Sequence, residues 1–188
     1  MEGYILYRMS DWREDREPHR TLTVRELVWR TSEAWEALIS FLAAQDPLVF
    51  EILHRTPRGE PLHPYLRSSY VKAEIEPEFM LRLVDVEGAL KLLDRALERP
   101  LILEVSDDVI EENAGPYTFG DGEVVRGAEA QESVALDVRR LTQLYAGYLP
   151  ASQLARHGLV EPSSPQALEL LEKLFPLDHP WVYPPDHF

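Results

Sequence analysis

The sequence of 188 residues contains no cysteine. That absence excludes disulfide bonds, a thiol nucleophile and the cysteine-ligated classes of zinc site. A cysteine-free chain is compatible with the reducing cytosol, where disulfides are rare. We therefore expect a cytoplasmic protein whose fold is held together by an apolar core.

Long apolar runs and positive charge are also scarce. No run reaches the roughly 18 apolar residues that a membrane-spanning helix needs, and the first residues, MEGYI, lack the basic and apolar segments of a signal peptide. Only 19 Lys and Arg stand against 33 Asp and Glu, which gives a formal net charge of -14. Because this field repels phosphates, we expect neither nucleic acid nor a membrane as a partner. A cationic ligand would be attracted, although solubility alone also explains such a charge.

An apolar fraction of 45% is enough for a core, and the length fits one domain or two small ones. In the first part we predict a helix capped by Thr31, and a bulge near Glu26 in the strand before it. Alternating apolar residues predict strands over residues 4–9, 22–29, 49–54, 70–75 and 79–84. Because an undefended first strand is a sticky edge, we expect further chain upstream or a covering partner.

The composition changes near Asp85, which we predict to cap a helix. The almost wholly apolar residues 101–105 predict a central strand. Further strands are expected at 117–119, 123–125 and 134–138, and helices at 141–148, 150–158 and after the pair Ser164-Pro165. The sequence thus predicts a mixed α/β (α+β) fold in two parts, residues 1–84 and 85–188.

The junction RTSEAW at residues 30–35 lies between a predicted strand and a predicted helix. Acetyltransferases of the GNAT superfamily carry Arg/Gln-x-x-Gly-x-Gly/Ala there, because the pyrophosphate of coenzyme A approaches backbone N–H groups over glycines. Here Glu33 and Trp35 replace the two glycines, adding an opposing charge and a bulky ring. We therefore expect this topology without a cofactor site in this chain.

Three other patterns have ordinary structural explanations. Glycines at 115, 120 and 122 indicate a hairpin, since no lysine follows as in a phosphate loop. The pairs Asp178-His179 and Asp186-His187 offer metal ligands, but about three convergent ligands are usually needed, so we expect no metal. The aromatic tail 176–188 either docks for stability or oligomer contact, or delivers the terminal carboxylate of Phe188 into a site.

Stretches spread over nearly the whole chain carry a family resemblance: GYILYR (3–8), LTVRELV (22–28), EAWEAL (33–38), MLRLVDV (80–86) with residues 89–90, then 101–107, 113–115, 136–138, 144–148 and the closing DHF (186–188). In this order they resemble the enhanced-intracellular-survival (Eis-like) acetyltransferases of the GNAT superfamily. The first three resemble that family's degenerate central GNAT-like domain. The later ones resemble its sterol-carrier-like C-terminal domain.

The resemblance implies an enzyme of three parts, of which the first, an active GNAT domain that binds acetyl-CoA, is absent here. The implied function is therefore the non-cofactor-binding C-terminal portion of an N-acetyltransferase, inactive alone. The resemblance further implies a homo-oligomer, an amine substrate, the carboxylate of Phe188 as catalytic base and Asp186 in substrate binding. Two alternatives stay open: a stand-alone module that binds an apolar ligand in a cavity lined by residues such as Leu103 and Leu144, or an oligomerisation scaffold with a filled core.

Overall fold

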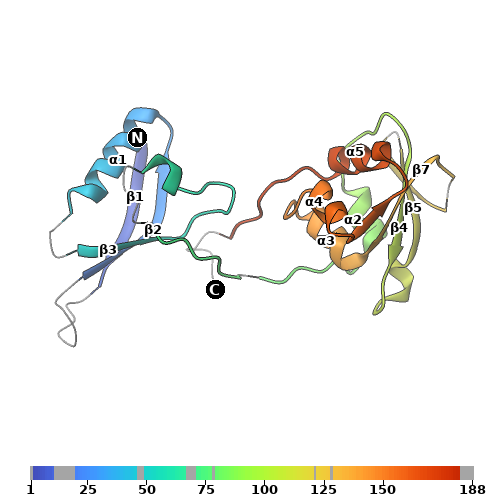
Figure 1. The fold of residues 1–188 in the computed structure, drawn as a ribbon, viewed down its shortest axis with the longest axis horizontal. Coiled ribbons are helices and arrows are strands. Elements are labelled where there is room, and N and C mark those ends of the chain that lie inside the picture. The colour runs from blue at the N-terminus through green and yellow to red at the C-terminus, as the bar shows by residue number, and fades with distance from the viewer. Residues whose placement is uncertain are drawn as a thin grey trace. The chain divides into compact units, whose positions relative to one another are not determined.

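The computed structural model describes residues 2–10, 20–45, 49–66, 71–77, 79–120, 122–127 and 129–182. These residues form two compact units. The first runs up to Ala73 and also includes Trp181, and the second spans Glu74–Pro180. Each unit has its own sheet and its own apolar core, as Figure 1 shows for the sheets. The fold is therefore mixed α and β, as the sequence predicts, while the division after residue 84 stays a prediction.

The described part of the first unit is a three-stranded sheet with one α-helix. Strand β2 is central, antiparallel to β1 and parallel to β3, so the helix is the crossover of a β-α-β unit. The pairing of β1 with β2 shifts between Glu26 and Val24, which confirms the predicted bulge. The elements are β1 (Gly3–Met9), β2 (Arg20–Trp29), α1 (Ser32–Ala43), β3 (Val49–His54) and the short 3-10 helix η1 (His63–Tyr65).

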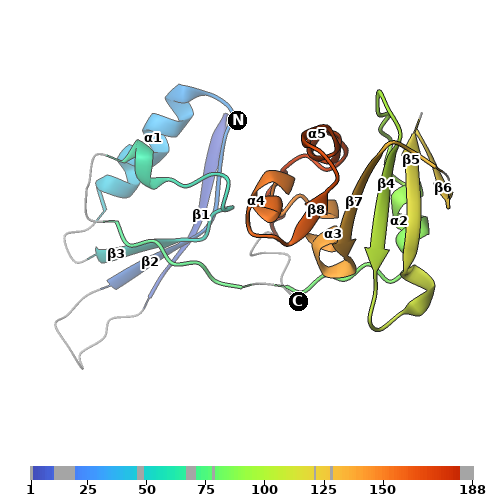
Figure 2. The same ribbon diagram turned by 45° about the vertical axis from the view of Figure 1, so that its right-hand side comes forward.

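The bulge explains how β2 keeps its apolar side chains on one face. Leu22, Val24 and Leu27 are all buried, although the last two lie three positions apart rather than two. The extra residue of the bulge turns Leu27 back to the same side. Trp35 and Leu38 of α1 pack against this cluster, and α1 covers one face of the sheet (Figure 2).

The described part of the second unit is a five-stranded sheet in the order β6-β5-β4-β7-β8, in which only β4 and β7 are parallel. Its helices lie on one side of the sheet (Figure 1) and share one buried cluster with β4, β5 and β7. Leu101 and Leu103 of β4 are fully buried, which confirms that this strand is central. The elements are α2 (Val86–Lys91), β4 (Leu101–Ser106), η2 (Glu111–Asn113), β5 (Gly115–Gly120), β6 (Glu123–Arg126), β7 (Glu132–Asp137), α3 (Val138–Tyr145), α4 (Ala151–Arg156), β8 (Val160–Pro162) and α5 (Pro165–Leu174).

Helix starts follow the predicted capping residues. The side chains of Thr31, Asp85 and Ser164 accept hydrogen bonds from the backbone N–H groups three residues on. Asp137 does the same for α3, so the strand predicted to continue to Val138 ends one residue earlier. Hydroxyl and carboxylate caps of this kind replace the partners that the first helical N–H groups lack.

The strands predicted at 70–75 and 79–84 are wrong, because the described residues 71–77 and 79–84 contain none. Their apolar side chains have no sheet to lie on: Ile75 is 84% exposed and Met80 fully exposed. The end of this segment is instead held by side chains of the second unit. The backbone N–H of Leu83 donates to Thr142, so this donor is not available for a strand ladder, and the N–H of Val86, the first residue of α2, donates to Asn113.

Candidate functional site

The N-terminus of α1 is where the sequence places a degenerate cofactor loop. The Oγ1 of Thr31 accepts a hydrogen bond from the N–H of Ala34 at 3.2 Å. The carboxylate of Glu33 accepts from its own backbone N–H and from the hydroxyls of Ser32 and Thr31, and these bonds hold the pKa of Glu33 below its ordinary value. The anionic group at this helix start is therefore supplied by the chain itself.

The aromatic ring at the second glycine position is partly buried and packs against the core of the first unit. Trp35 packs against Trp29 with ring centroids 4.7 Å apart and meets the ring of Tyr65 edge-on at 6.3 Å. A glycine position lets a ligand approach the backbone closely, whereas this indole fills the space beside the helix. The residues present at this junction do not fit a coenzyme A pyrophosphate.

A buried polar cluster fixes the segment that leads into the second unit. The carboxylate of Asp107 is inaccessible to solvent and pairs with Arg82 at 2.5 Å. Burial by itself raises the pKa of Asp107. The N–H groups of Ile110 and Val109, the amide of Asn113 and the charge of Arg82 outweigh that effect, so the pKa lies well below its ordinary value. The carboxylate therefore stays ionised as the centre of the cluster.

Asn113 extends this cluster to the start of α2. Its Oδ1 accepts from the N–H of Val86 at 3.0 Å, and its Nδ2 donates to the carbonyl of Val84 at 3.3 Å and to Asp107 at 3.1 Å. The phenol of Tyr117 donates to the backbone carbonyl of Asn113 at 2.9 Å. Burial raises the pKa of Tyr117, which keeps this donor protonated.

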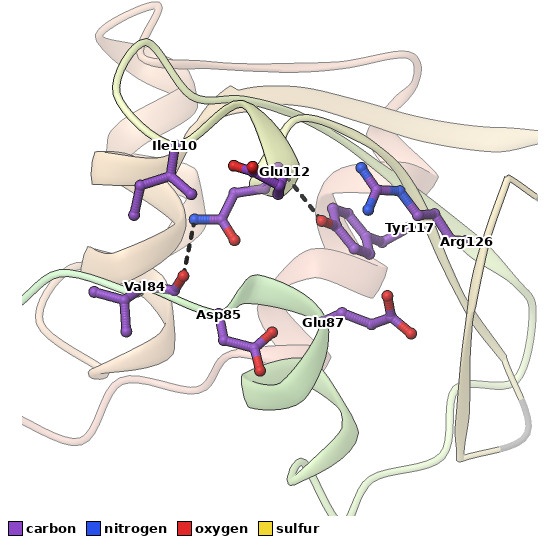
Figure 3. Close-up of a pocket in the computed structure, with 8 residues that line it drawn as sticks. Val84, Asp85, Glu87, Ile110, Glu112, Tyr117 and Arg126 are labelled. Atoms are coloured by element: carbon purple, nitrogen blue, oxygen red, sulfur yellow. Dashed lines mark hydrogen bonds between the residues drawn. The ribbon is translucent and has the colours of Figure 1, made fainter.

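A shallow pocket of about 320 Å³ opens beside this cluster (Figure 3). Two of its carboxylates already have partners: Asp85 caps α2, and Glu87 pairs with Lys91 at 2.6 Å. The guanidinium of Arg126 lies 5.3 Å above the ring of Tyr117 and donates to a backbone carbonyl. The pocket thus combines three carboxylates with one cation, without a predicted site residue in its wall. It is lined by Val84, Asp85, Glu87, Ile110, Glu112, Asn113, Tyr117 and Arg126.

The glycine-rich turn is a hairpin, as predicted. Strands β5 and β6 pair as antiparallel neighbours on either side of it, and Gly122 has a φ of 80°. Gly115, at the start of β5, has a φ of 136° and faces the guanidinium of Arg126, which a β-carbon there would approach to 3.3 Å. Gly122 therefore supports the hairpin turn, and Gly115 leaves room for Arg126 in the wall of the pocket.

The predicted catalytic residue Phe188 and the predicted substrate-binding residue Asp186 lie outside the described residues. Asp178 and His179 are described, and their backbone N–H groups both donate to the carbonyl of Gly147, at 3.0 and 3.1 Å. Within the described ranges, no group of three or more His, Asp or Glu side chains could hold a metal ion. The same residues include no helix that is both long and apolar enough to cross a membrane.

The residues named for an apolar-ligand cavity are packed into the core. Leu103 is fully buried and Leu144 is 1% exposed, both within the continuous cluster of the second unit. Neither side chain lines the pocket of Figure 3. At these two positions, the structure has a filled core.

Sequence reasoning missed the cluster around Asp107, because its partners lie 25 and 6 residues away in the chain. One signal was local: Asp107 accepts from the N–H groups two and three residues on, a turn that aspartate favours. The helix end at Gly147, whose carbonyl accepts from Asp178 and His179, also had a signal, since this glycine follows the apolar helix face of residues 141–145.

Comparison with known proteins assigns both parts of the chain. Residues 86–183 match the family described as sterol carrier protein domain. The chain belongs to this family. Residues 1–83 match the model described as acetyltransferase (GNAT) domain, so a GNAT-like part precedes the sterol carrier protein domain. No curated protein is significantly similar in sequence to this chain.

Solved structures match this chain over nearly its whole length. Eis1 from Mycobacterium abscessus is 33% identical with a TM-score of 0.70, over 96% of this chain and 47% of Eis1. A GCN5-related N-acetyltransferase from Anabaena variabilis is 24% identical with a TM-score of 0.76, over 96% of this chain and 46% of that one. A probable N-acyltransferase from Enterococcus faecalis is 24% identical with a TM-score of 0.73, over 92% and 43%. The sterol carrier family chain described here thus spans about half the length of these proteins.

Proposed function

We propose that this chain is the C-terminal, non-cofactor-binding portion of an acetyl-CoA-dependent, Eis-like N-acetyltransferase. The observation that carries the proposal is that 96% of the chain matches 47% of Eis1, with the GNAT domain ahead of the sterol carrier protein domain. The self-capped start of α1 supports it, since Thr31 and Glu33 occupy the place of a pyrophosphate. Acetyl-CoA then belongs to a further GNAT domain of the complete enzyme.

In this proposal the chain forms the amine side of the active site. Its net charge of -14 attracts a protonated amine, which must lose a proton before it can attack an acyl group. The carboxylate of Phe188 accepts that proton, and Asp186 holds the cationic substrate. An α-carboxylate has an ordinary pKa of about 3.5, so it is ionised at neutral pH. We further propose that the enzyme is a cytoplasmic homo-oligomer.

The alternative, an apolar-ligand carrier, has less support. The residues named for its cavity, Leu103 and Leu144, are packed in the core. A filled core suits a part that supports a neighbouring site or an assembly better than it suits a lipid carrier.

The test compares this chain alone with the chain joined to an acetyl-CoA-binding GNAT domain, by the release of free coenzyme A from acetyl-CoA and an amine. We expect activity only in the joined form. Activity of the chain alone at a comparable rate would overturn the proposal.

The role of Phe188 is tested in the joined enzyme by adding one glycine after it, which moves the carboxylate and keeps the ring. We expect at least about a tenfold loss of kcat, the low end of general-base effects. The matched control is Phe188→Leu, which keeps the carboxylate in place. Equal kcat for the extended and parent enzymes would remove the carboxylate from the mechanism.

A further inference from the structure

The pocket of Figure 3 contains a cation that has no ion pair. The guanidinium of Arg126 donates to the backbone carbonyl of Ala114 and lies over the ring of Tyr117. Among the described residues it forms no ion pair, although three carboxylates line the same pocket. A guanidinium carries several N–H donors in a planar fork, and the bond to Ala114 uses one of them. The other donors are available for an anionic acceptor.

The backbone of β5 and the ring of Tyr117 hold this guanidinium in place. Gly115 lets it approach closely, since a β-carbon there would lie 3.3 Å from Nη2 of Arg126. The cation lies 5.3 Å from the ring centroid of Tyr117, which is itself fixed by the bond from its phenol to Asn113. The side chain of Arg126 is therefore positioned before any ligand arrives, which lowers the entropy cost of binding.

Negative charge in the pocket is only partly used by the protein. Glu87 is paired with Lys91. Asp85 uses its Oδ1 to cap α2 and, within the described ranges, has no ion pair. Glu112 is exposed and makes neither a hydrogen bond nor an ion pair in the part of the chain that the structure describes. Two carboxylates in the wall are thus available for cationic groups of a ligand.

The remaining wall is apolar. Val84 is 69% exposed and Ile110 is partly buried, and both line the pocket. In Figure 3 they lie on the left, whereas Arg126 lies on the right beyond Tyr117. An apolar surface of this kind suits the methylene chain of an amphipathic ligand, whose charged ends stay at the polar groups.

We propose that this pocket binds a free basic amino acid such as lysine. The α-carboxylate of the ligand pairs with Arg126, its two ammonium groups lie at Asp85 and Glu112, and its methylene chain packs on Val84 and Ile110. The charges are complementary, because the ligand carries one negative and two positive groups and the unpaired lining carries one positive and two negative groups. This binding goes beyond the proposed acetyl transfer and does not rest on it, since no residue of the pocket has a role in that reaction.

Ligands with charge of one sign match the pocket less well. A diamine satisfies the carboxylates but is repelled by Arg126, which it leaves unpaired. A simple carboxylic acid pairs with Arg126 and is repelled by the carboxylates. Specificity for the amino acid therefore comes from the repulsive elements as well as from the attractive ones.

The experiment is calorimetric titration of the 188-residue chain with L-lysine at low salt. We expect saturable binding with a dissociation constant on the order of 1 mM, as suits a few exposed charge contacts. Cadaverine, which lacks the carboxylate, and L-norleucine, which lacks the side-chain ammonium, should each bind at least about threefold more weakly. Moderate salt should weaken the binding of lysine.

One pair of variants tests the carboxylate end of the pocket. Glu112→Gln should weaken lysine binding about threefold, the scale of an exposed ion pair. Glu111→Gln is the matched control and should leave the affinity unchanged. Both residues are exposed neighbours in η2 and both changes remove the same charge, but only Glu112 lines the pocket.

A second pair tests the cation. Arg126→Gln should weaken lysine binding about tenfold, because a guanidinium can bind a carboxylate through two parallel hydrogen bonds. The affinity for cadaverine should not fall in this variant, since a repulsive charge is removed. Arg126→Lys keeps the charge without the fork and should lie between the parent and Arg126→Gln. Arg156→Gln, at an exposed position of α4 outside the pocket, is the control for net charge.

The absence of saturable lysine binding at tens of millimolar, about tenfold above the expected constant, overturns the inference. Equal affinities for lysine and cadaverine overturn the role of Arg126, and equal affinities for lysine and norleucine overturn the second ammonium group. Equal binding by Glu112→Gln and Glu111→Gln removes the site from this pocket. If Arg126→Gln does not fold, the two ligand comparisons in the parent chain and the Glu112 pair still decide.

Discussion

Asn113→Ala tests whether the polar cluster at the start of α2 stabilises the second unit. The amide is buried, 4% exposed, and makes three hydrogen bonds, with the N–H of Val86, the carbonyl of Val84 and the carboxylate of Asp107. Alanine removes all three bonds and supplies no replacement. The backbone around Asn113 needs no change, because alanine adopts the same conformation.

The magnitude follows from the groups left behind. A buried N–H without an acceptor, here that of Val86, costs about 1–3 kcal/mol, and the lost bond to the carbonyl of Val84 about 0.5–1.5 kcal/mol. We therefore expect the free energy of unfolding of the second unit to fall by about 2–4 kcal/mol. The loss of a donor to Asp107 acts in the same direction. Tyr117→Phe is the comparison, since it removes a single bond to the carbonyl of Asn113 and should cost only about 1 kcal/mol.

The assay is urea unfolding followed by two signals. All four tryptophans lie outside Glu74–Pro180, so tryptophan fluorescence reports on the first unit, whereas far-UV circular dichroism reports on both. We expect Asn113→Ala to lower the midpoint of the second unit's transition in circular dichroism and to leave the fluorescence transition in place. A cost for Asn113→Ala no larger than that for Tyr117→Phe would refute the reasoning.

Three further predictions follow from the charges and the helix start. Calorimetric titration of this chain with acetyl-CoA should show no micromolar binding, because Glu33 and Trp35 occupy the place of the cofactor loop; a micromolar dissociation constant would contradict this account. Burial lowers the pKa of His54 more than its bond to the carbonyl of Val24 raises it, so His54 is protonated at a higher pH in the unfolded chain than in the folded one. The first unit should therefore lose stability as the pH falls below 6.5. In fluorescence-detected unfolding, His54→Gln should reduce this dependence of stability on pH. Sedimentation should show self-association that strengthens with moderate salt, which screens the net charge of -14; a monomer at high concentration and moderate salt is the opposing result.

Local chemistry made most of the fold predictable. Capping side chains such as Thr31 and Asp85, and the apolar run of β4, act within a few residues, so sequence spacing alone reveals them. The strand prediction for the segment before Asp85 failed for the opposite reason. It has the alternating pattern of a strand, but Leu83 and Val86 donate to side chains 59 and 27 residues away, and sequence spacing does not reveal such partners.

The candidate site, too, could be predicted from the sequence only in part. The replacement of the cofactor glycines by Glu33 and Trp35 is visible in the sequence, and the structure adds where both side chains go. The crossing of Asp178 over Gly147 is not visible there, because it depends on how α3 and the end of the chain pack together. The sequence therefore shows which family positions carry unusual residues, whereas only the packed structure shows which distant segments contact each other.

Two attachments to α3, at Thr142 and at Gly147, fix the course of the chain near the start and the end of the second unit. A C-terminal segment that only needed cover could dock through its aromatic side chains and would not need a glycine beneath its backbone. Here the backbone is held at Gly147, and the turn at His179 is kept in a conformation that costs about 1–3 kcal/mol. The surrounding structure must offset that cost, so the direction of the segment is specified as well as its presence. The glycine at position 147 and the turn at His179 therefore fix the course of the described backbone at residues 178–180.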